Sequence, residues 1–440
     1  MKFSAALAFN TIYRTLNIGV TLLIVVLVSK LAGVAGYGLL SLMLINAAVF
    51  NMVTALGVDA GITWHSANGC LAAGKIIGLI GMIVVGQLLL LGGVEWIHYA
   101  ITGYYWIFKS NLPSGWWIGL AFLLSVSLTE KYTALFNGHH LFVLCSKILL
   151  YTNLLVLLIL AVLCMYYPQY AAARLAMLYA GLYLLQSVVL VVLFHRKTRI
   201  GISFSFMDRG ELKAFLSFSI VTLVTNSLQF LAYRADYWFI DYYKGEKELG
   251  WYSLAVRLVQ VFWILPMLFA GMLFPVVAKE RDRYDERQML SFTRILFFFN
   301  LLAGLLSFFL VPWIVEWIWG DMYLASVPLF RILLPGFILF CPTTILAAWF
   351  AGQGRLIVNL KGSALCFASV VLLDLLLVPV WGMKGASIAS STGYSITTVY
   401  FAGVFCVRTK TPLHELFFFR RADWAHFRRA LRTSVIKEAI

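Results

Sequence analysis

The chain has 440 residues, of which 62% are hydrophobic and only 12% are charged. Soluble domains contain about 45–50% apolar and about 25% charged residues, so this composition excludes an ordinary soluble protein and indicates a membrane protein. The net charge of +15 does not indicate nucleic acid as a partner, because the basic residues gather in loops and in the tail. The six cysteines are scattered singly, so we predict neither a disulfide framework nor a metal site.

Twelve apolar segments are long enough to cross a hydrocarbon core of roughly 30 Å as α-helices. Trp and Tyr residues stand at the ends of several segments, for example Trp116 and Trp117, as expected of anchors at headgroup level. The first segment is too long for the core of a signal peptide, so we interpret it as an uncleaved span. We predict an all-α, polytopic membrane protein with about 12 transmembrane helices, at 9–32, 38–62, 75–98, 116–137, 147–167, 172–194, 214–235, 250–276, 290–316, 324–350, 357–380 and 385–407.

The distribution of basic residues predicts the orientation of the chain. An even number of spans places both termini on one side, and the loops and termini of that side carry 22 Lys and Arg residues against 6 on the other side. Basic residues accumulate on the cytoplasmic side of membrane proteins. We therefore expect both termini to be cytoplasmic.

A basic, polar break divides the spans into two sets of six. Related Gly-aromatic sequences, Gly36-Tyr37-Gly38 and Gly250-Trp251-Tyr252, open the second and eighth spans, and internal repeats are common in transporters. We predict two pseudo-symmetric six-helix bundles at 1–195 and 214–407, joined by a basic cytoplasmic linker at 196–213. The tail, 408–440, combines basic and apolar residues at helical spacing. We expect an amphipathic tail on the anionic cytoplasmic leaflet, either as a positive anchor or with a regulatory role.

Polar side chains form one face of several predicted spans, although polar groups are costly in contact with lipid. Such a face either lines a hydrated cavity or packs helices against one another. For the first and seventh spans we favour the cavity, because their polar faces are long and include charge. The substrate-cavity candidates are Asn10, Arg14, Asn17, Asn226, Gln229, Arg257, Gln260 and Arg331.

Four acidic residues within or near the spans are candidates for cation coupling: Asp59, Glu130, Asp236 and Asp374. A carboxylate in the membrane can carry a proton or bind Na⁺. The alternative is structural pairing with a cation, which is strong for Asp236 with Arg234 because both residues can lie at the outer membrane interface. That alternative is weaker for Asp374, which stands alone in an apolar span.

No sequence pattern of catalysis is present. The chain has no phosphate-binding Gly-rich loop, no HExxH sequence and no large segment between spans. We interpret His139 and His140, in a short predicted loop, as solvated side chains. We expect a transporter rather than an enzyme, with no catalytic residue and no cofactor, driven by an ion gradient, the membrane potential or the substrate gradient.

Several short sequences resemble the Wzx-type polysaccharide (O-antigen) flippases of the multidrug/oligosaccharidyl-lipid/polysaccharide (MOP) exporter superfamily. Each sequence is loose by itself, but together they follow the order of the family along nearly the whole chain. They are Gly36–Leu42, Leu56–Ile62, Arg234–Ile240, Leu249–Leu258 with the later Phe274-Pro275, Ala351–Arg355 and Val378–Ala386.

The resemblance implies two six-helix bundles that form a V around a central cavity, in the bacterial inner membrane. It implies alternating-access export of an undecaprenyl-pyrophosphate-linked oligosaccharide for lipopolysaccharide or another surface polysaccharide, coupled to a cation. We assign Arg14, Arg257 and Arg331 to the lipid pyrophosphate, because guanidinium groups suit such anions. Membrane lipids and other polysaccharide-assembly proteins are further expected partners. A drug/cation antiporter of the same superfamily is the alternative, and a membrane-embedded glycan polymerase or ligase is a third, weaker interpretation.

Overall fold

The computed structural model describes residues 3–55, 57–68, 72–111, 113–167, 171–201, 208–280, 286–420 and 423. These residues form helices joined by short turns, and none of them forms a strand. The all-α fold expected from the sequence is confirmed for this part of the chain. Contacts divide the chain into two compact units, Met1–Ser227 and Leu228–Ile440.

The boundary between the units lies further along the chain than the linker expected at 196–213. It falls within α7 (Arg209–Ala232), so that most of this helix belongs to the N-terminal unit. Residues 202–207 of the expected linker lie outside the described residues, as do 421–422 and 424–440 of the expected tail.

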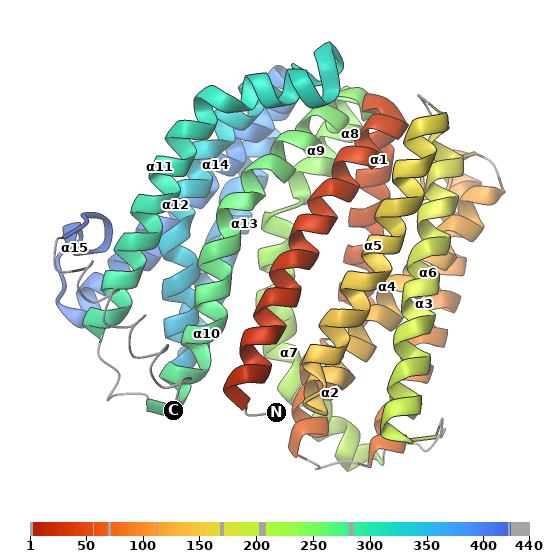
Figure 1. The fold of residues 1–440 in the computed structure, drawn as a ribbon, viewed down its shortest axis with the longest axis horizontal. Coiled ribbons are helices and arrows are strands. Elements are labelled where there is room, and N and C mark those ends of the chain that lie inside the picture. The colour runs from red at the N-terminus through yellow and green to blue at the C-terminus, as the bar shows by residue number, and fades with distance from the viewer. Residues whose placement is uncertain are drawn as a thin grey trace. The chain divides into compact units, whose positions relative to one another are not determined.

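The N-terminal unit is a bundle of long helices (Figure 1). Helix α1 packs against α5 and α4, and α4 also packs against α6, α2 and α3. The buried core between α2, α3, α4, α5 and α6 contains mainly Ile, Leu and Phe side chains. Besides α7, the helices are α1 (Phe3–Thr54), α2 (Val58–Asn68), α3 (Ala73–Thr102), α4 (Ser114–Gly138), α5 (Phe142–Tyr166) and α6 (Ala172–Thr198).

Helix α1 contains the first expected span and most of the second, separated by a kink rather than a loop. The kink is at Gly33, whose φ of 66° and ψ of −179° are accessible to glycine but not to residues with a Cβ atom. The second expected span, 38–62, is wrong at its end, because the helix stops at Thr54 and Gly57 takes a φ of 68°. Residues from Val58 onward belong to the separate helix α2.

The C-terminal unit is built around α12, which packs against α14, α10, α11 and α9. Helix α13 packs against α14 and α8. After α7 the elements are α8 (Ala235–Lys244), α9 (Glu246–Gln260), the 3₁₀ turn η1 (Val261–Trp263), α10 (Ile264–Glu280), α11 (Glu286–Trp319), the 3₁₀ turn η3 (Gly320–Tyr323), α12 (Ser326–Gly352), α13 (Leu356–Trp381), α14 (Met383–Thr409) and α15 (His414–Phe417).

Nine helices in the described part of the chain are long and apolar enough to cross a membrane. Helix α1 counts once among them although it carries two expected spans, and α7 and α14 cover the other two expected spans as helices. The expected spans at 214–235 and 250–276 are interrupted, by the break between α7 and α8 and by η1. The chain is therefore a multi-pass membrane protein.

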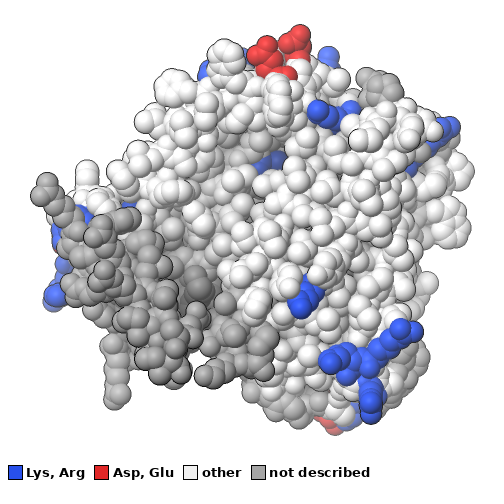
Figure 2. Space-filling view, viewed as in Figure 1, with Lys and Arg blue, Asp and Glu red and all other residues white. Residues whose placement is uncertain are grey.

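The outer surface of the helices is apolar, as required of a surface in contact with lipid. On α11, Leu305, Leu306 and Phe309 are exposed, and Trp317 near its end is 86% exposed. Most of the described surface visible in Figure 2 carries no Lys, Arg, Asp or Glu side chain. The polar side chains of the spans are instead found mainly inside each unit.

Candidate functional site

Besides Asp423 of the tail, the C-terminal unit buries two carboxylates within its helices. Asp236 lies in the first turn of α8 and is 1% exposed, and Asp374 lies within α13 and is 0% exposed. Helix α8 packs against α13, which brings the two residues close enough to interact electrostatically. Like charges in a low-dielectric interior repel strongly, so the pair is most stable when a proton or another cation neutralises it.

Asp236 is held in place by three hydrogen bonds from separate groups. Its Oδ1 accepts the backbone N–H of Tyr237 at 2.9 Å, and its Oδ2 accepts Ser390 Oγ at 3.1 Å and the hydroxyl of Tyr252. The break between α7 and α8 makes this arrangement possible, because it starts a new helix whose N-terminal end favours a carboxylate. Asp236 is thus a rigidly positioned acceptor.

Asp374 has no such support. Both of its carboxylate oxygens are buried, and neither has a hydrogen-bond partner among the described residues. Ionisation of a carboxylate that is buried without a partner costs roughly several kcal/mol, because the charge loses its hydration and gains no compensating contact. The side chain is therefore suited to carry a proton or to bind a cation beside Asp236.

Aromatic side chains lie around Asp236. Tyr252 packs edge-on against Tyr237, with ring centroids 5.5 Å apart, and Tyr394 packs against Tyr233 at 5.7 Å. Arg234 lies over the Tyr237 ring at 5.4 Å and donates to its hydroxyl at 3.2 Å. Arg234 therefore stacks on tyrosine, and among the described residues it forms no ion pair with Asp236. The expected structural pairing of these two residues is not formed.

A second buried polar cluster lies in the N-terminal unit, around Lys131 of α4. Lys131 is 0% exposed, and its Nζ donates to Ser127 Oγ at 2.8 Å, Asn51 Oδ1 at 3.3 Å and Gln87 Oε1 at 3.5 Å. Asn51 also donates to Glu130, a predicted coupling residue. We refer to Asn51, Gln87, Ser127 and Lys131 as the Lys131 cluster.

Asp59, on α2, is a neighbour of this cluster and interacts electrostatically with Lys131 and Glu130. Its Oδ1 is buried and has no hydrogen-bond partner among the described residues. Asp59 and Glu130 therefore share one electrostatic environment with Lys131, whereas the other two coupling candidates belong to the acid pair.

The polar face of α1 is directed mainly towards α5. Asn10 Oδ1 accepts Ser146 Oγ at 2.7 Å, and Asn17 Oδ1 accepts Asn153 Nδ2 at 2.9 Å. Arg14, between them, is exposed and lines a cavity of about 290 Å³ together with Asn17 and residues of α4 and α5. Both asparagines thus contact α5, and Arg14 and Asn17 are the members of this face that line the cavity.

The other cavity candidates are dispersed over the C-terminal unit and the end of α7. Asn226 is exposed, and Gln229 Oε1 accepts Ser363 Oγ of α13 at 2.8 Å. Arg257 donates to Gln260 at 3.4 Å on the same face of α9, and both are partly buried.

Arg331 has a structural environment that the sequence did not predict. Its guanidinium stacks over the Phe308 ring at 4.6 Å, and its Nε donates to the Phe308 carbonyl at 3.3 Å. Pro312, four residues after Phe308 in α11, has no N–H to donate to that carbonyl. Arg331 therefore supplies the hydrogen bond that the proline removes.

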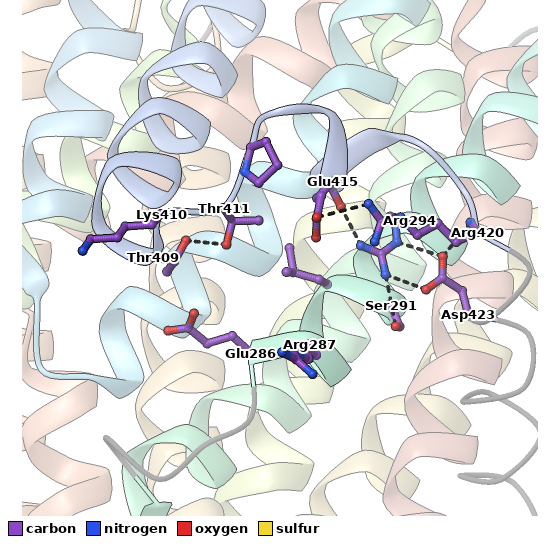
Figure 3. Close-up of a pocket in the computed structure, with 12 residues that line it drawn as sticks. Glu286, Arg287, Ser291, Arg294, Thr409, Lys410, Thr411, Glu415, Arg420 and Asp423 are labelled. Atoms are coloured by element: carbon purple, nitrogen blue, oxygen red, sulfur yellow. Dashed lines mark hydrogen bonds and ion pairs between the residues drawn. The ribbon is translucent and has the colours of Figure 1, made fainter.

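A cavity of about 530 Å³ lies where the tail returns to α11 (Figure 3). Arg294 of α11 donates from Nε and Nη2 to the two oxygens of Asp423, at 2.8 and 2.5 Å, and from Nη1 to the carbonyl of Glu415 at 2.7 Å. Burial raises the pKa of Asp423, but the hydrogen bonds from Arg294, from the backbone of Arg420 and from Ser291, together with the charge of Arg294, outweigh burial and hold this pKa below its usual value. We call residues 414–420 together with Asp423 the tail clip.

Comparison with known proteins identifies the family. Residues 96–328, just over half of the chain, match the family described as polysaccharide biosynthesis protein. The chain belongs to this family. A sequence search against curated proteins gives no match.

Solved structures with the same fold are transporters of the MOP superfamily. An inward-facing multidrug resistance MATE family transporter matches with a TM-score of 0.68 and 13% identity, covering 89% of this chain and 95% of that one. The lipid II flippase MurJ, in an inward closed conformation, matches with a TM-score of 0.68 and 13% identity. The match covers 94% of this chain and 88% of that one. A MOP superfamily transporter from Pyrococcus furiosus matches with a TM-score of 0.64 and 14% identity. The match covers 94% of this chain and 96% of that one. The expected MOP-type fold is confirmed.

Sequence reasoning identified the four acids but missed most of their neutral partners. Asn51, Gln87, Ser127, Tyr252 and Ser390 are buried and bind the charged groups. Polar residues that stand alone in apolar spans are the signal that could have found them, since such residues are rare unless they have a partner. The roles assigned to the twelve candidate residues remain predictions.

Proposed function

We propose that this protein is a MOP-type flippase that moves an undecaprenyl-pyrophosphate-linked oligosaccharide, such as an O-antigen unit, from the cytoplasmic to the outer leaflet of the inner membrane. Family membership in polysaccharide biosynthesis supports a saccharide substrate. The fold, similar to that of the lipid II flippase MurJ, supports a lipid-linked one. On this proposal the protein is a transporter and not an enzyme.

Coupling to H⁺ or Na⁺ is supported by one observation above all, the buried acid pair. Asp374 lacks any hydrogen-bond donor among the described residues, while Asp236 is fixed nearby by Tyr252 and Ser390. A cation that binds between the two carboxylates lowers their repulsion and favours the conformation in which they are close. Opening of the site to the other side of the membrane then releases the cation.

The pyrophosphate of the substrate is expected to bind cationic side chains, for which Arg14 and Arg257 remain the best candidates. Arg14 is exposed at a cavity, and Arg257 is partly buried and already directed towards Gln260. Both termini are placed in the cytoplasm on the basis of the loop charges alone.

The first experiment is genetic. Deletion of the gene should leave the lipid-linked oligosaccharide facing the cytoplasm and stop the assembly of the surface polysaccharide. Complementation should fail with Asp374→Asn and Asp236→Asn but succeed with Asp321→Asn, a matched substitution at an exposed residue of η3. Normal surface polysaccharide in the deletion strain, in the absence of a paralogue, would refute the proposal.

The arginines are tested in the same strain. Arg14→Ala or Arg257→Ala should reduce export without loss of protein from the membrane, and lysine at the same position should restore part of it. Wild-type export by both alanine variants would assign these residues to structural roles.

A drug/cation antiporter is the second candidate, because MATE transporters share the fold as closely as MurJ does. The two functions predict different phenotypes. An antiporter should confer drug resistance and ion-dependent dye efflux on a sensitive strain, whereas a flippase should leave dye accumulation unchanged and restore only the polysaccharide.

A further inference from the structure

The Lys131 cluster has the composition of a monovalent-cation site. Its three acceptors, Asn51 Oδ1, Gln87 Oε1 and Ser127 Oγ, are neutral oxygens that come from three helices, α1, α3 and α4. Oxygen ligands of this kind suit hard cations. The group in the centre is the ammonium of Lys131, which is 0% exposed.

The ammonium fits its surroundings without an ion pair. A protonated lysine has three N–H donors and no acceptor, and here three oxygens lie within 2.8 to 3.5 Å of Nζ. Among the described residues no carboxylate pairs directly with it. Asp59 and Glu130 act on it from a longer distance. This is the arrangement of a bound ion, with neutral oxygens around it and negative charge beyond them.

The oxygens are also fixed before any ion arrives. Gln87 Nε2 donates to Asn51 Oδ1 at 3.0 Å and to Thr54 Oγ1 at 2.8 Å, and Ser127 donates to Gln87 Oε1 at 2.6 Å. Removal of Lys131 would therefore leave a set of oriented oxygens with no cation, near two carboxylates. Such a set attracts a replacement cation from solution.

We infer that the N-terminal unit contains a monovalent-cation pocket that is permanently filled by the chain's own Lys131 ammonium. The acid pair of the C-terminal unit, in contrast, forms no direct ion pair with a Lys or Arg among the described residues, and Arg234 acts on Asp236 only from a longer distance. Insofar as the inference bears on transport it rests on the proposed function, and it then removes the oxygens of Asn51, Gln87 and Ser127 from the groups that can bind an exchangeable coupling ion. The pocket itself does not depend on transport.

The test replaces the tethered ammonium by a free one. Lys131→Ala removes Cγ, Cδ, Cε and Nζ, which n-propylammonium contains in the same order. The thermal stability of the purified variant should rise in a saturable manner with n-propylammonium, as expected when a ligand binds only the folded state. Tetramethylammonium, which has the charge but no N–H donor, should have little effect, and Na⁺ should stabilise the variant more weakly than n-propylammonium.

Two matched variants serve as controls. Lys384→Ala, at an exposed lysine of α14, and the wild-type protein should show no stabilisation by n-propylammonium beyond that seen with tetramethylammonium. Lys131→Met fills the pocket with an uncharged chain, so it should be less stable than wild type and should not respond to either amine.

If Lys131→Ala folds poorly, the yield of monodisperse protein solubilised with and without n-propylammonium gives the same answer. A higher yield with the amine supports the pocket. Equal yields, or a melting temperature of Lys131→Ala that does not respond to n-propylammonium, would overturn the inference. Failure of the flippase proposal would appear instead as normal polysaccharide in the deletion strain and would leave these melting data unchanged.

Discussion

The tail clip offers a prediction whose size follows from its contacts. The pair Arg294–Asp423 is almost completely buried, with side-chain exposures of 6% and 1%, and is joined by two hydrogen bonds. Removal of one partner of a buried pair costs about 3–5 kcal/mol, because the other charge is left without compensation. Asp423→Ala should therefore destabilise the docked clip by up to this amount. The cost is limited because the clip can open, and water then hydrates the unpaired Arg294.

The expected result is local opening rather than loss of the fold. Each ~1.4 kcal/mol corresponds to a tenfold change in an equilibrium constant, so a cost of about 3 kcal/mol raises the open population by more than about 100-fold. Hydrogen exchange of the amides around Leu416, which is fully buried, should accelerate accordingly in Asp423→Ala. Exchange in α12, inside the core of the same unit, should be unchanged.

A second ion pair in the same clip provides the control. Arg420 and Glu415 are 3.1 Å apart, but their side chains are 48% and 27% exposed. Exposed pairs contribute about 0–1 kcal/mol, so Arg420→Ala should change exchange by less than about tenfold. Equal exchange in the Asp423→Ala and Arg420→Ala variants would show that burial of the Arg294 pair contributes nothing.

The pH dependence of the clip has a defined sign. The pKa of Asp423 is held below its usual value, so its stabilising effect is present above the unfolded pKa of roughly 3.9 and is lost as the pH falls through the folded value. Exchange around Leu416 should be constant, after correction for intrinsic rates, from about pH 5 to 8. Opening should begin only below about pH 4, and a clip that opens between pH 6 and 5 would contradict this assignment.

Two further predictions concern packing within the C-terminal unit. A Cβ atom at Gly336 would lie 2.5 Å from the backbone of α14, whereas one at Gly403 meets nothing within 4 Å. Gly336→Ala should therefore lower the free energy of unfolding by about 1–3 kcal/mol. Gly403→Ala should raise it by about 0.5–1 kcal/mol, and thermal unfolding measures both changes. Arg331→Gln should destabilise by about 1–3 kcal/mol because the Phe308 carbonyl loses its donor. In a Pro312→Ala background, where the helix supplies that donor, the effect should fall by more than half, and equal effects in both backgrounds would refute this role of Arg331.

The membrane class and most of the helices follow from composition and from the length of apolar segments, because these are local properties. The junction at Gly33 shows the limit. The sequence indicates two spans there, but whether a glycine forms a loop or a kink in one continuous helix depends on packing against α5 and α4. Similarly, apolarity did not predict that Gly57 ends the second span before Val58.

The site was predictable residue by residue but not as a set. Asp236 and Asp374 stand out in the sequence because charge is rare in a span, yet their proximity depends on the packing of α8 against α13. The alternative of a direct ion pair between Arg234 and Asp236 is not seen, because the guanidinium stacks on the Tyr237 ring and acts on Asp236 only from a longer distance. We predicted that Arg331 binds substrate. The presence of Pro312 in an apolar span already indicated that the carbonyl of Phe308, four residues earlier, needs another donor.

The two units solve the problem of buried charge in opposite ways. In the N-terminal unit, Lys131 supplies a cation that cannot leave, and the oxygens around it are satisfied in every ionic condition. In the C-terminal unit, Asp374 has no hydrogen-bond donor among the described residues. The buried carboxylate is therefore neutralised only by a proton or an ion from solution. A coupling site must be able to lose its cation, so the acid pair can respond to an ion gradient, whereas the oxygens that hold the tethered Lys131 ammonium cannot. If the protein is cation-coupled, substitutions in the acid pair should therefore change its ion dependence, whereas substitutions in the Lys131 cluster should change its stability.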